Sequence, residues 1–331
     1  MTATDTRFKM LVMGDSIIWG QGLYDHQKIH TLVIAQLKRL GLDVDCTFLA
    51  HSGAIIGDPV KPDELPPLDG PFANEVPVSE PTVFNQIRTV LGAAERDESV
   101  NLVILNGGVN DVDTVRIINP TNLHLDEQIK DAFYTQTKML IEKVFNCFPN
   151  AIIIVAGYYL FFSDVSEESV VQSALKGMGF DVPMIPHQVS EFMVDALGSV
   201  FTDTLIERCT RFRDQSHDYI REVIVELTGI MPEVQARVFL ADPKFKDENA
   251  VGAPESFLFG VNADLSPQDP PDIAEGRREA CERHADRLSP VRQIAGPRAS
   301  LGHPNPAGAK QYADVIVANI RYAMPTMFES Q

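Results

Sequence analysis

The chain has 331 residues, of which 44% are hydrophobic and 22% are charged. This composition fits one large globular domain or two small ones, with enough apolar side chains for a core. Lys and Arg total 28 against 46 Asp and Glu, a formal charge of −18. The charge argues against a nucleic-acid-binding protein, since phosphate backbones are bound by clustered cations.

Apolar runs of strand length alternate with helical patterns along most of the chain. The runs are Phe8–Gly14, Val44–Ala50, Val100–Asn106, Ala151–Gly157 and Ala236–Ala241. The helical patterns are Gln27–Leu40, Thr82–Arg96, Asp126–Phe148, Val189–Leu227 and Ala307–Ala323. Such alternation is typical of a parallel sheet covered by helices on both faces. We therefore predict an α/β protein, a flavodoxin-like three-layer α/β/α sandwich with a five-stranded parallel sheet that binds ligands at the carboxyl ends of its strands.

Two long segments interrupt the alternation after the fourth predicted strand. The first, at about 158–233, has apolar residues at helical spacing between Val189 and Phe201. This apolar face would belong either to a lid over the site or to a helix packed on the core. The second, at about 243–302, is rich in Pro and Gly, with one short charged helix around Ala274–Leu288. Loops this long are usually functional or disordered. We expect a single domain over residues 1–331 in which both insertions form a cap over the site.

The remaining sequence-wide patterns concern membranes, cysteines and assembly. The first apolar run, Met10–Met13, is far shorter than a signal segment or a membrane-spanning helix. The cysteines lie far apart, without the CxxC spacing of a zinc site: Cys46, Cys147, Cys209 and Cys281. We expect a cytoplasmic protein without stable membrane insertion. A homo-oligomer is compatible with the sequence but not indicated by it.

Polar motifs follow three of the predicted strands. Ser16 lies just past the first strand, Gly53 just past the second and Asn110 just past the third. The pair Asn305-Pro306 is typical of a helix N-terminus, which places His303 immediately before the last helix. Because the carboxyl ends of parallel strands meet at one edge of a sheet, we expect all of these groups to converge there.

These residue types suit acyl transfer through a covalent ester intermediate. A serine hydroxyl is a poor nucleophile until a base removes its proton, and histidine is the base poised for this near neutral pH. Attack on an ester carbonyl creates an oxyanion, which needs hydrogen-bond donors at about 3 Å. The backbone N–H groups of Ser16 and Gly53 and the side-chain amide of Asn110 would supply three. The chemistry needs neither a metal nor an organic cofactor.

Four motifs stand in this order along the chain: Gly14-Asp15-Ser16-Ile17 with Trp19-Gly20, the turn at Gly53, Gly108-Val109-Asn110-Asp111 and His303-Pro304-Asn305. Together they resemble the motif blocks of the SGNH hydrolases, also called the GDSL esterase/lipase family. The resemblance covers the sheet core and the last helix and neither insertion. It implies that Ser16 is the nucleophile and His303 the general base, with Gly53, Asn110 and the Ser16 amide as oxyanion donors. The GxSxG motif of the other large serine-hydrolase fold is absent.

One position departs from the family pattern. The family usually has an aspartate three residues before the histidine, where this chain has Ser300, and a hydroxyl cannot stabilise an imidazolium as a carboxylate does. A main-chain carbonyl near Ser300 could hold the imidazole Nδ1–H, as in some family members. A carboxylate from elsewhere could replace the aspartate; the candidates are Asp242, Asp264 and Asp269. The third alternative is a non-catalytic site.

Other residues near these motifs have simpler interpretations. The run Tyr158–Phe162 follows the fourth strand and would pack in the core or form a pocket wall. Asp15 and Asp111 are expected to brace loops by accepting backbone N–H bonds. A basic cluster is expected on a surface helix with salt bridges, the alternative being an anionic substrate group bound there: Arg277, Arg278, Arg283 and Arg287.

The sequence thus predicts a serine hydrolase that cleaves a small-molecule carboxylic ester, of a lipid or a short-chain acyl group, through an acyl-serine intermediate. Two alternatives stay open: a carbohydrate O-acetyl esterase, and a non-catalytic ligand-binding protein on the same fold. The cap is expected to decide which acyl or alcohol group is accepted.

Overall fold

The computed structural model describes residues 7–177, 191–262 and 264–328. Of residues 177 and 191–201 it describes the backbone only. Five strands form one parallel sheet in the order β2-β1-β3-β4-β5. They are β1 (Phe8–Met13), β2 (Val44–Phe48), β3 (Leu102–Leu105), β4 (Ile152–Ala156) and β5 (Val238–Ala241). This order is that of a flavodoxin-like sheet, and the predicted three-layer α/β/α fold with five parallel strands is confirmed.

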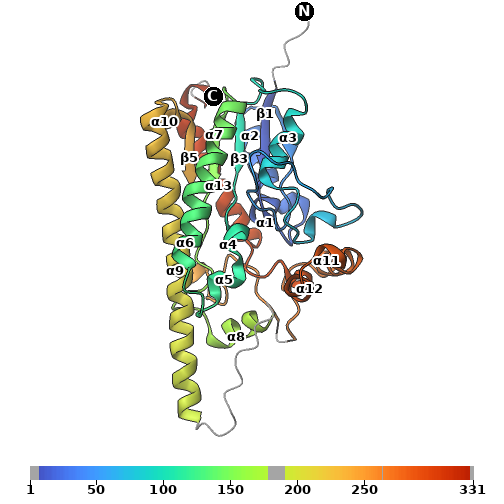
Figure 1. Cartoon of the computed structure of the whole chain (residues 1–331), viewed down its shortest axis with the longest axis vertical. Helices are drawn as coiled ribbons and strands as arrows, with labels where there is room; N and C mark the ends of the chain where they lie inside the picture. Colours follow the sequence, from blue (N-terminus) through green and yellow to red (C-terminus); the bar gives the residue numbers. More distant parts are fainter. Residues whose placement is uncertain (1–6, 178–190, 263, 329–331) are drawn as a thin grey trace, which may run out of the picture.

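Helices cover both faces of the sheet (Figure 1). The long ones are α2 (Ile29–Arg39), α3 (Val83–Leu91), α7 (Thr137–Cys147), α9 (Glu191–Ile230) and α13 (Pro306–Ala323). Helices α2 and α13 pack against each other on one face, and α7 and α9 pack together on the other. The central strands β3 and β4 are buried along their whole length, as expected for Val-, Ile- and Leu-rich strands between two helical layers.

Shorter helices fill the connections. They are α1 (Ser16–Trp19), α4 (Val109–Val112), α5 (Thr114–Ile118), α6 (Leu125–Lys130), α8 (Glu168–Gly177), α10 (Val234–Arg237), α11 (Pro271–Arg283), α12 (Pro290–Ala295) and α14 (Pro325–Phe328). Single 3₁₀ turns span Asp25–Gln27, Ala73–Glu75, Asp247–Asn249, Ala285–Arg287 and Gly296–Arg298. A π-helical turn at Asp131–Gln136 joins α6 to α7, where the sequence predicts one continuous helix. Helix α3 ends earlier than predicted, at Leu91, because Gly92 adopts a positive φ of 54°.

The two insertions contribute their own helices. The first contains α8 and α9, and the second contains α11 and α12, which lie beside the loops at the carboxyl ends of the strands (Figure 1). The predicted apolar face between Val189 and Phe201 lies outside the residues whose side chains are described. Over the described residues, the structure has no helix both long and apolar enough to span a bilayer.

Candidate active site

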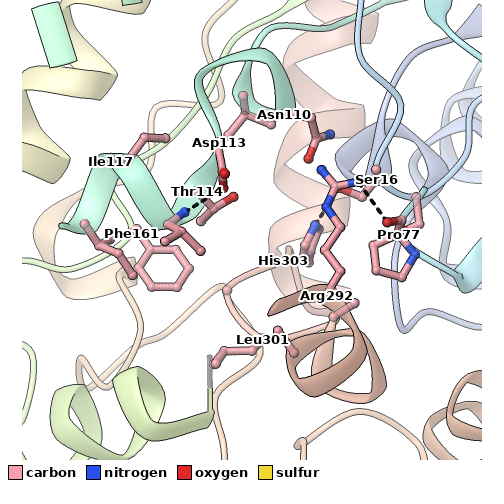
Figure 2. Close-up of a pocket in the computed structure, with 18 of the residues that line it drawn as sticks. Ser16, Pro77, Asn110, Asp113, Thr114, Ile117, Phe161, Arg292, Leu301 and His303 are labelled. Atoms are coloured by element: carbon pink, nitrogen blue, oxygen red, sulfur yellow. Dashed lines mark hydrogen bonds between the residues drawn. The ribbon is translucent and has the colours of Figure 1, made fainter. Parts of the chain in front are cut away.

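Ser16 and His303, 287 positions apart in sequence, meet at the carboxyl edge of the sheet. Nε2 of His303 lies 2.7 Å from Oγ of Ser16 (Figure 2). Ser16 is the first residue of α1, directly after β1 and the turn at Gly14-Asp15. His303 precedes α13, whose N-terminus is capped by Asn305 with a proline in the first turn. The local sequence signals at both helix starts thus place the two side chains.

Asp15 fixes the turn that presents Ser16. Its carboxylate accepts hydrogen bonds from the Ile17 N–H at 2.9 Å, the Asn106 amide at 2.7 Å and the Tyr158 hydroxyl at 2.7 Å. The side chain is fully buried, and burial raises the pKa of Asp15 while these hydrogen bonds oppose the shift. A carboxylate with three donors holds α1 in one position relative to β3 and β4, which is the bracing role predicted for it.

Gly53 and Asn110 lie in the same cavity as Ser16 and His303. Gly53 has a φ of 80°, and a Cβ there would lie 2.6 Å from the carbonyl carbon of Pro77, so only glycine fits. Among the described residues, neither the Ser16 N–H nor the Gly53 N–H donates to an acceptor. The Asn110 amide donates to the Ala54 carbonyl at 3.0 Å, which leaves its second hydrogen free. Three candidate donors therefore belong to residues that line this cavity.

Asp111 ties the loop of Asn110 to the loop of Gly53. Its carboxylate accepts the Ile56 N–H at 3.1 Å, as the bracing prediction for Asp111 expects. Burial raises the pKa of Asp111 to about 6. The two loops that carry candidate oxyanion donors are thus coupled by one hydrogen-bonded carboxylate.

Among the described residues, no carboxylate pairs with His303. Within the described chain, its Nδ1 is buried and makes no hydrogen bond. Burial lowers the pKa of His303 to about 4, and the main-chain groups of Leu301, Ser300 and Ala299 oppose the shift, although none reaches Nδ1 with hydrogen-bond geometry. The hydroxyl of Ser300 does not serve the imidazole either, because it accepts a hydrogen bond from Nη2 of Arg277 at 3.3 Å. The main chain of residues 299–301 is thus what favours the charged form of the imidazole.

The structure does not bring any of the three alternative carboxylates to His303. Asp242 accepts the Lys244 N–H at 2.9 Å and lies 3.9 Å from Nδ1 of another histidine, His217. Asp264 is exposed and bonds within its own turn. Asp269 is buried but faces an arginine of α11. The support of His303 by Asp242 that the sequence suggests has no counterpart in these contacts, because Asp242 follows β5 and turns toward α9.

Arg277 is the centre of a buried ion cluster. Its Nη1 lies 3.0 Å from Glu75 and 2.8 Å from Asp269, and all three side chains are almost completely buried. The prediction of an exposed helix is therefore wrong for Arg277, and correct for Arg278, which pairs with two glutamates of α11 in solvent. Through Ser300 the cluster fixes α11 against the segment that leads to His303.

The cavity beside Ser16 has a volume of about 300 Å³ and mainly apolar walls. Its lining includes Val109, Ile117 and Ile118 after β3, Tyr158, Tyr159 and Phe161 after β4, Cys209 and Phe212 of α9, and Val291, Arg292 and Ala295 of α12. The aromatic run after β4 fulfils both of its interpretations, because three members line the cavity while Phe162 is buried in the core. Both insertions contribute walls.

Sequence reasoning missed Arg292. It belongs to α12, which does not directly follow a strand in the sequence. Its side chain points toward Ser16 and His303, across the cavity from Ile117 and Phe161 (Figure 2). The pair Ser289-Pro290 is a helix-start signal, and Ser289 does cap α12. That signal predicts a helix but gives no direction for its side chains.

Comparisons with known proteins find similar folds but no similar sequence. No protein-family model matches the chain, and no curated protein matches it. The extracellular lipase from Streptomyces rimosus is 14% identical, over 94% of this chain and 99% of that chain, with a TM-score of 0.48. A family two carbohydrate esterase from Clostridium thermocellum is 13% identical, over 98% and 67%, with a TM-score of 0.45. AlinE4, an SGNH-hydrolase family esterase, is 13% identical, over 62% and 98%, with a TM-score of 0.28.

All three likenesses are distant, with TM-scores below 0.5. The flavodoxin-like strand order is established by the structure itself, and the resemblance of the four motifs to those of the SGNH hydrolases stays a prediction from the sequence. Identities this low carry no information about its substrate.

Proposed function

We propose that the protein is a serine hydrolase that cleaves a carboxylic ester through an acyl-serine intermediate. The observation that supports this most directly is the 2.7 Å distance between Oγ of Ser16 and Nε2 of His303 at the wall of an apolar cavity. A nucleophile and a base within hydrogen-bond reach are the minimum that acyl transfer requires.

The first half of the reaction acylates Ser16. Nε2 of His303 takes the hydroxyl proton as Oγ bonds to the ester carbonyl carbon, and the carbonyl π electrons move onto oxygen. The N–H groups of Ser16 and Gly53 and the free hydrogen of Asn110 then stabilise that oxyanion. When the intermediate collapses, the bond to the alkoxy oxygen breaks, and this oxygen takes the proton from Nε2 and leaves as the alcohol.

The second half returns the enzyme to its starting state. Water attacks the acyl carbon while His303 removes one of its protons, and the same donors stabilise the second oxyanion. Collapse breaks the bond to Oγ, which takes the proton back from Nε2 and releases the carboxylic acid. We assign the stabilisation of Nδ1–H to the main-chain carbonyls of residues 299–301, since catalytic hydrogen bonds often tighten only when substrate is bound.

The cavity favours a lipid or short-chain acyl ester over a sugar acetate. Ile117, Phe161 and Phe212 are among the side chains that line it, and they offer contact area to an acyl chain but no hydrogen bonds to sugar hydroxyls. Its volume of about 300 Å³ is at the lower end of ligand pockets, which suits a small molecule. The two insertions form a cap that selects the ester.

The test compares wild type with Ser16→Ala on p-nitrophenyl acetate, butyrate and longer esters. Ester cleavage by wild type and its loss in the variant are the expected results, together with covalent labelling of Ser16 by a fluorophosphonate, read by peptide mass. Ser52→Ala is the matched control, because Ser52 lines the same cavity and lies outside the Ser16–His303 hydrogen bond. This control should keep the label.

Two other results would replace the proposal. Turnover by wild type no faster than by Ser16→Ala would favour the ligand-binding protein, for which the unpartnered Nδ1 of His303 is the motivation. Acetate release from acetylated sugars, with no cleavage of longer acyl esters, would favour the carbohydrate O-acetyl esterase.

A further inference from the structure

Arg292 places a positive charge in the wall of the cavity that contains Ser16 and His303. Its guanidinium extends from α12 toward the serine, and Nη1 donates to the Pro77 carbonyl at 3.0 Å and to the Ser79 hydroxyl at 3.4 Å (Figure 2). The side chain is half-buried. Two neutral acceptors thus hold one corner of the guanidinium in a fixed position.

The charge of Arg292 has no carboxylate partner. In the described parts of the chain, no Asp or Glu oxygen lies within 4 Å of it. Burial lowers the pKa of Arg292, and Asp113, which lines the same cavity, opposes that shift. The Asp113 carboxylate itself accepts the Val115 N–H at 3.0 Å. Arg277 is different, because two carboxylates surround it. A partly desolvated guanidinium without a counter-ion favours an anionic ligand.

The unused edge of the guanidinium has the geometry for such a ligand. Nε and Nη2 donate to no acceptor within the described chain, and neither atom is sealed from solvent. These two N–H groups lie side by side and match the oxygens of a carboxylate or a phosphate with two parallel hydrogen bonds. Nη1 is the corner already fixed by Pro77, so the free edge is preorganised.

We propose that the site takes an ester that carries an anionic group, a carboxylate or a phosphate, and that the Nε–Nη2 edge of Arg292 binds it. This inference rests on the proposed ester hydrolysis and adds the substrate class. The apolar part of the ester lies on the Ile117 and Phe161 side of the cavity, opposite Arg292 (Figure 2). With a formal charge of −18 the protein does not attract anions in general, so recognition depends on this local contact.

A purely structural role for Arg292 would have a different signature. The Pro77 carbonyl that Arg292 binds belongs to the segment packed against Gly53, so loss of the side chain could disturb the oxyanion donors. That disturbance would slow neutral and anionic esters equally. The ratio of their kcat/KM values separates recognition of an anion from support of the loop.

The experiment uses four esters that share the phenyl ester bond. Phenyl butyrate is neutral; 4-(butyryloxy)benzoate and 4-(butyryloxy)phenyl phosphate bear the anion on the alcohol side; and monophenyl glutarate bears it on the acyl side. Arg292→Gln is compared with Arg298→Gln, because Arg298 lines the same cavity but its Nε is bonded to the Leu265 carbonyl at 2.8 Å.

Wild type should cleave at least one anionic ester with a higher kcat/KM than phenyl butyrate. In Arg292→Gln the anionic-to-neutral ratio should fall by about 10- to 100-fold, the scale of a charge-assisted hydrogen bond. Arg292→Lys should restore part of the ratio, and Arg298→Gln should keep it. The ester that shows the effect distinguishes carboxylate from phosphate and the acyl side from the alcohol side. Equal losses on all four esters, or a wild-type preference for the neutral ester, would overturn the inference.

Calorimetry measures how tightly the same esters bind to Ser16→Ala. Because this variant lacks the nucleophile, the measurement does not depend on ester cleavage. Tighter binding of an anionic ester than of phenyl butyrate, lost in Ser16→Ala/Arg292→Gln, supports the anion site even if wild type hydrolyses nothing. Cleavage of phenyl butyrate without any anion preference leaves ester hydrolysis intact and rejects the role of Arg292. Absence of a binding preference also rejects it.

Discussion

Nη2 of Arg277 lies 3.3 Å from Oγ of Ser300, three residues before His303. At the position where the motif resemblance leads us to expect an aspartate, this chain therefore has a hydroxyl that accepts a hydrogen bond from a buried arginine. The same guanidinium is neutralised by Glu75 and Asp269. The network connects α11 of the second insertion with the segment that leads to His303. Only main-chain groups of residues 299–301 then favour the charged form of the imidazole.

Replacement of Ser300 by alanine should lower kcat by less than about tenfold, since only a hydrogen bond to Arg277 is lost. The measurement is kcat on p-nitrophenyl butyrate with circular dichroism to verify the fold. Asp242→Asn is the companion variant and should also stay active, because Asp242 contacts Lys244 and His217. A drop of about 10⁴-fold in either variant, as when a triad aspartate is neutralised, would identify that residue as the support of His303.

Arg277→Ala should destabilise the protein by about 3–5 kcal/mol, because Glu75 and Asp269 would remain buried without their counter-charge. Its neighbour Arg278 is the matched control, since its side chain is 42% exposed and pairs with Glu275 in solvent. Arg278→Ala should cost much less, since ion pairs in solvent contribute little to stability. Urea unfolding of both variants gives the comparison. Equal losses would mean that burial of the Arg277 cluster contributes little.

The strand ends and the last helix could be predicted because their signals are local. Buried strands appear as short apolar runs, and the polar motif after each one must lie at the same sheet edge. The N-terminal signals of α13 likewise placed His303. The contact of Ser16 with His303 follows from these placements, although no pattern gives its 2.7 Å distance.

Other features depend on contacts between distant segments, which a single sequence does not reveal. Arg277 and Arg278 are adjacent in one charged helix, yet the side chain of Arg277 is buried and that of Arg278 is 42% exposed. Helical periodicity alone does not decide which side of the helix faces Glu75. The direction of Arg292 depends on how α12 sits over Pro77. For the same reason, the sequence leaves several candidates for the group that supports His303.

Asn110→Ala should lower kcat by about 10²- to 10³-fold with little change in KM, the result expected when an oxyanion donor acts mainly in the transition state. Asn122→Ala is the control for loss of an amide, because Asn122 bonds to the Arg116 carbonyl outside the cavity. Steady-state kinetics on p-nitrophenyl butyrate measure both variants. A raised KM with unchanged kcat in Asn110→Ala would instead make Asn110 a substrate-binding group.

The pH dependence of activity should be that of a histidine that is hard to protonate. Burial, reinforced by the positive charge of Arg277, lowers the pKa of His303 to about 4, whereas an unperturbed histidine titrates near 6.5. His303 must be neutral to accept the Ser16 proton. We therefore expect kcat/KM for phenyl butyrate to rise through about pH 4 and to be level across neutral pH.

The free energy of unfolding should also depend on pH through His303. Because the folded pKa of His303 is below the unfolded value, the folded state binds fewer protons between about pH 6.5 and 4, and the free energy of unfolding falls as the pH drops through that window. His303→Asn should remove this part of the slope in urea unfolding. Asp111, whose pKa burial raises to about 6, acts in the opposite direction, so Asp111→Asn is measured beside it.

The pH profile of kcat/KM gives the outcome that would contradict both expectations. A midpoint near pH 6.5 in that profile, if it persists in Asp111→Asn, would show that His303 has a stabilising partner for its charged form.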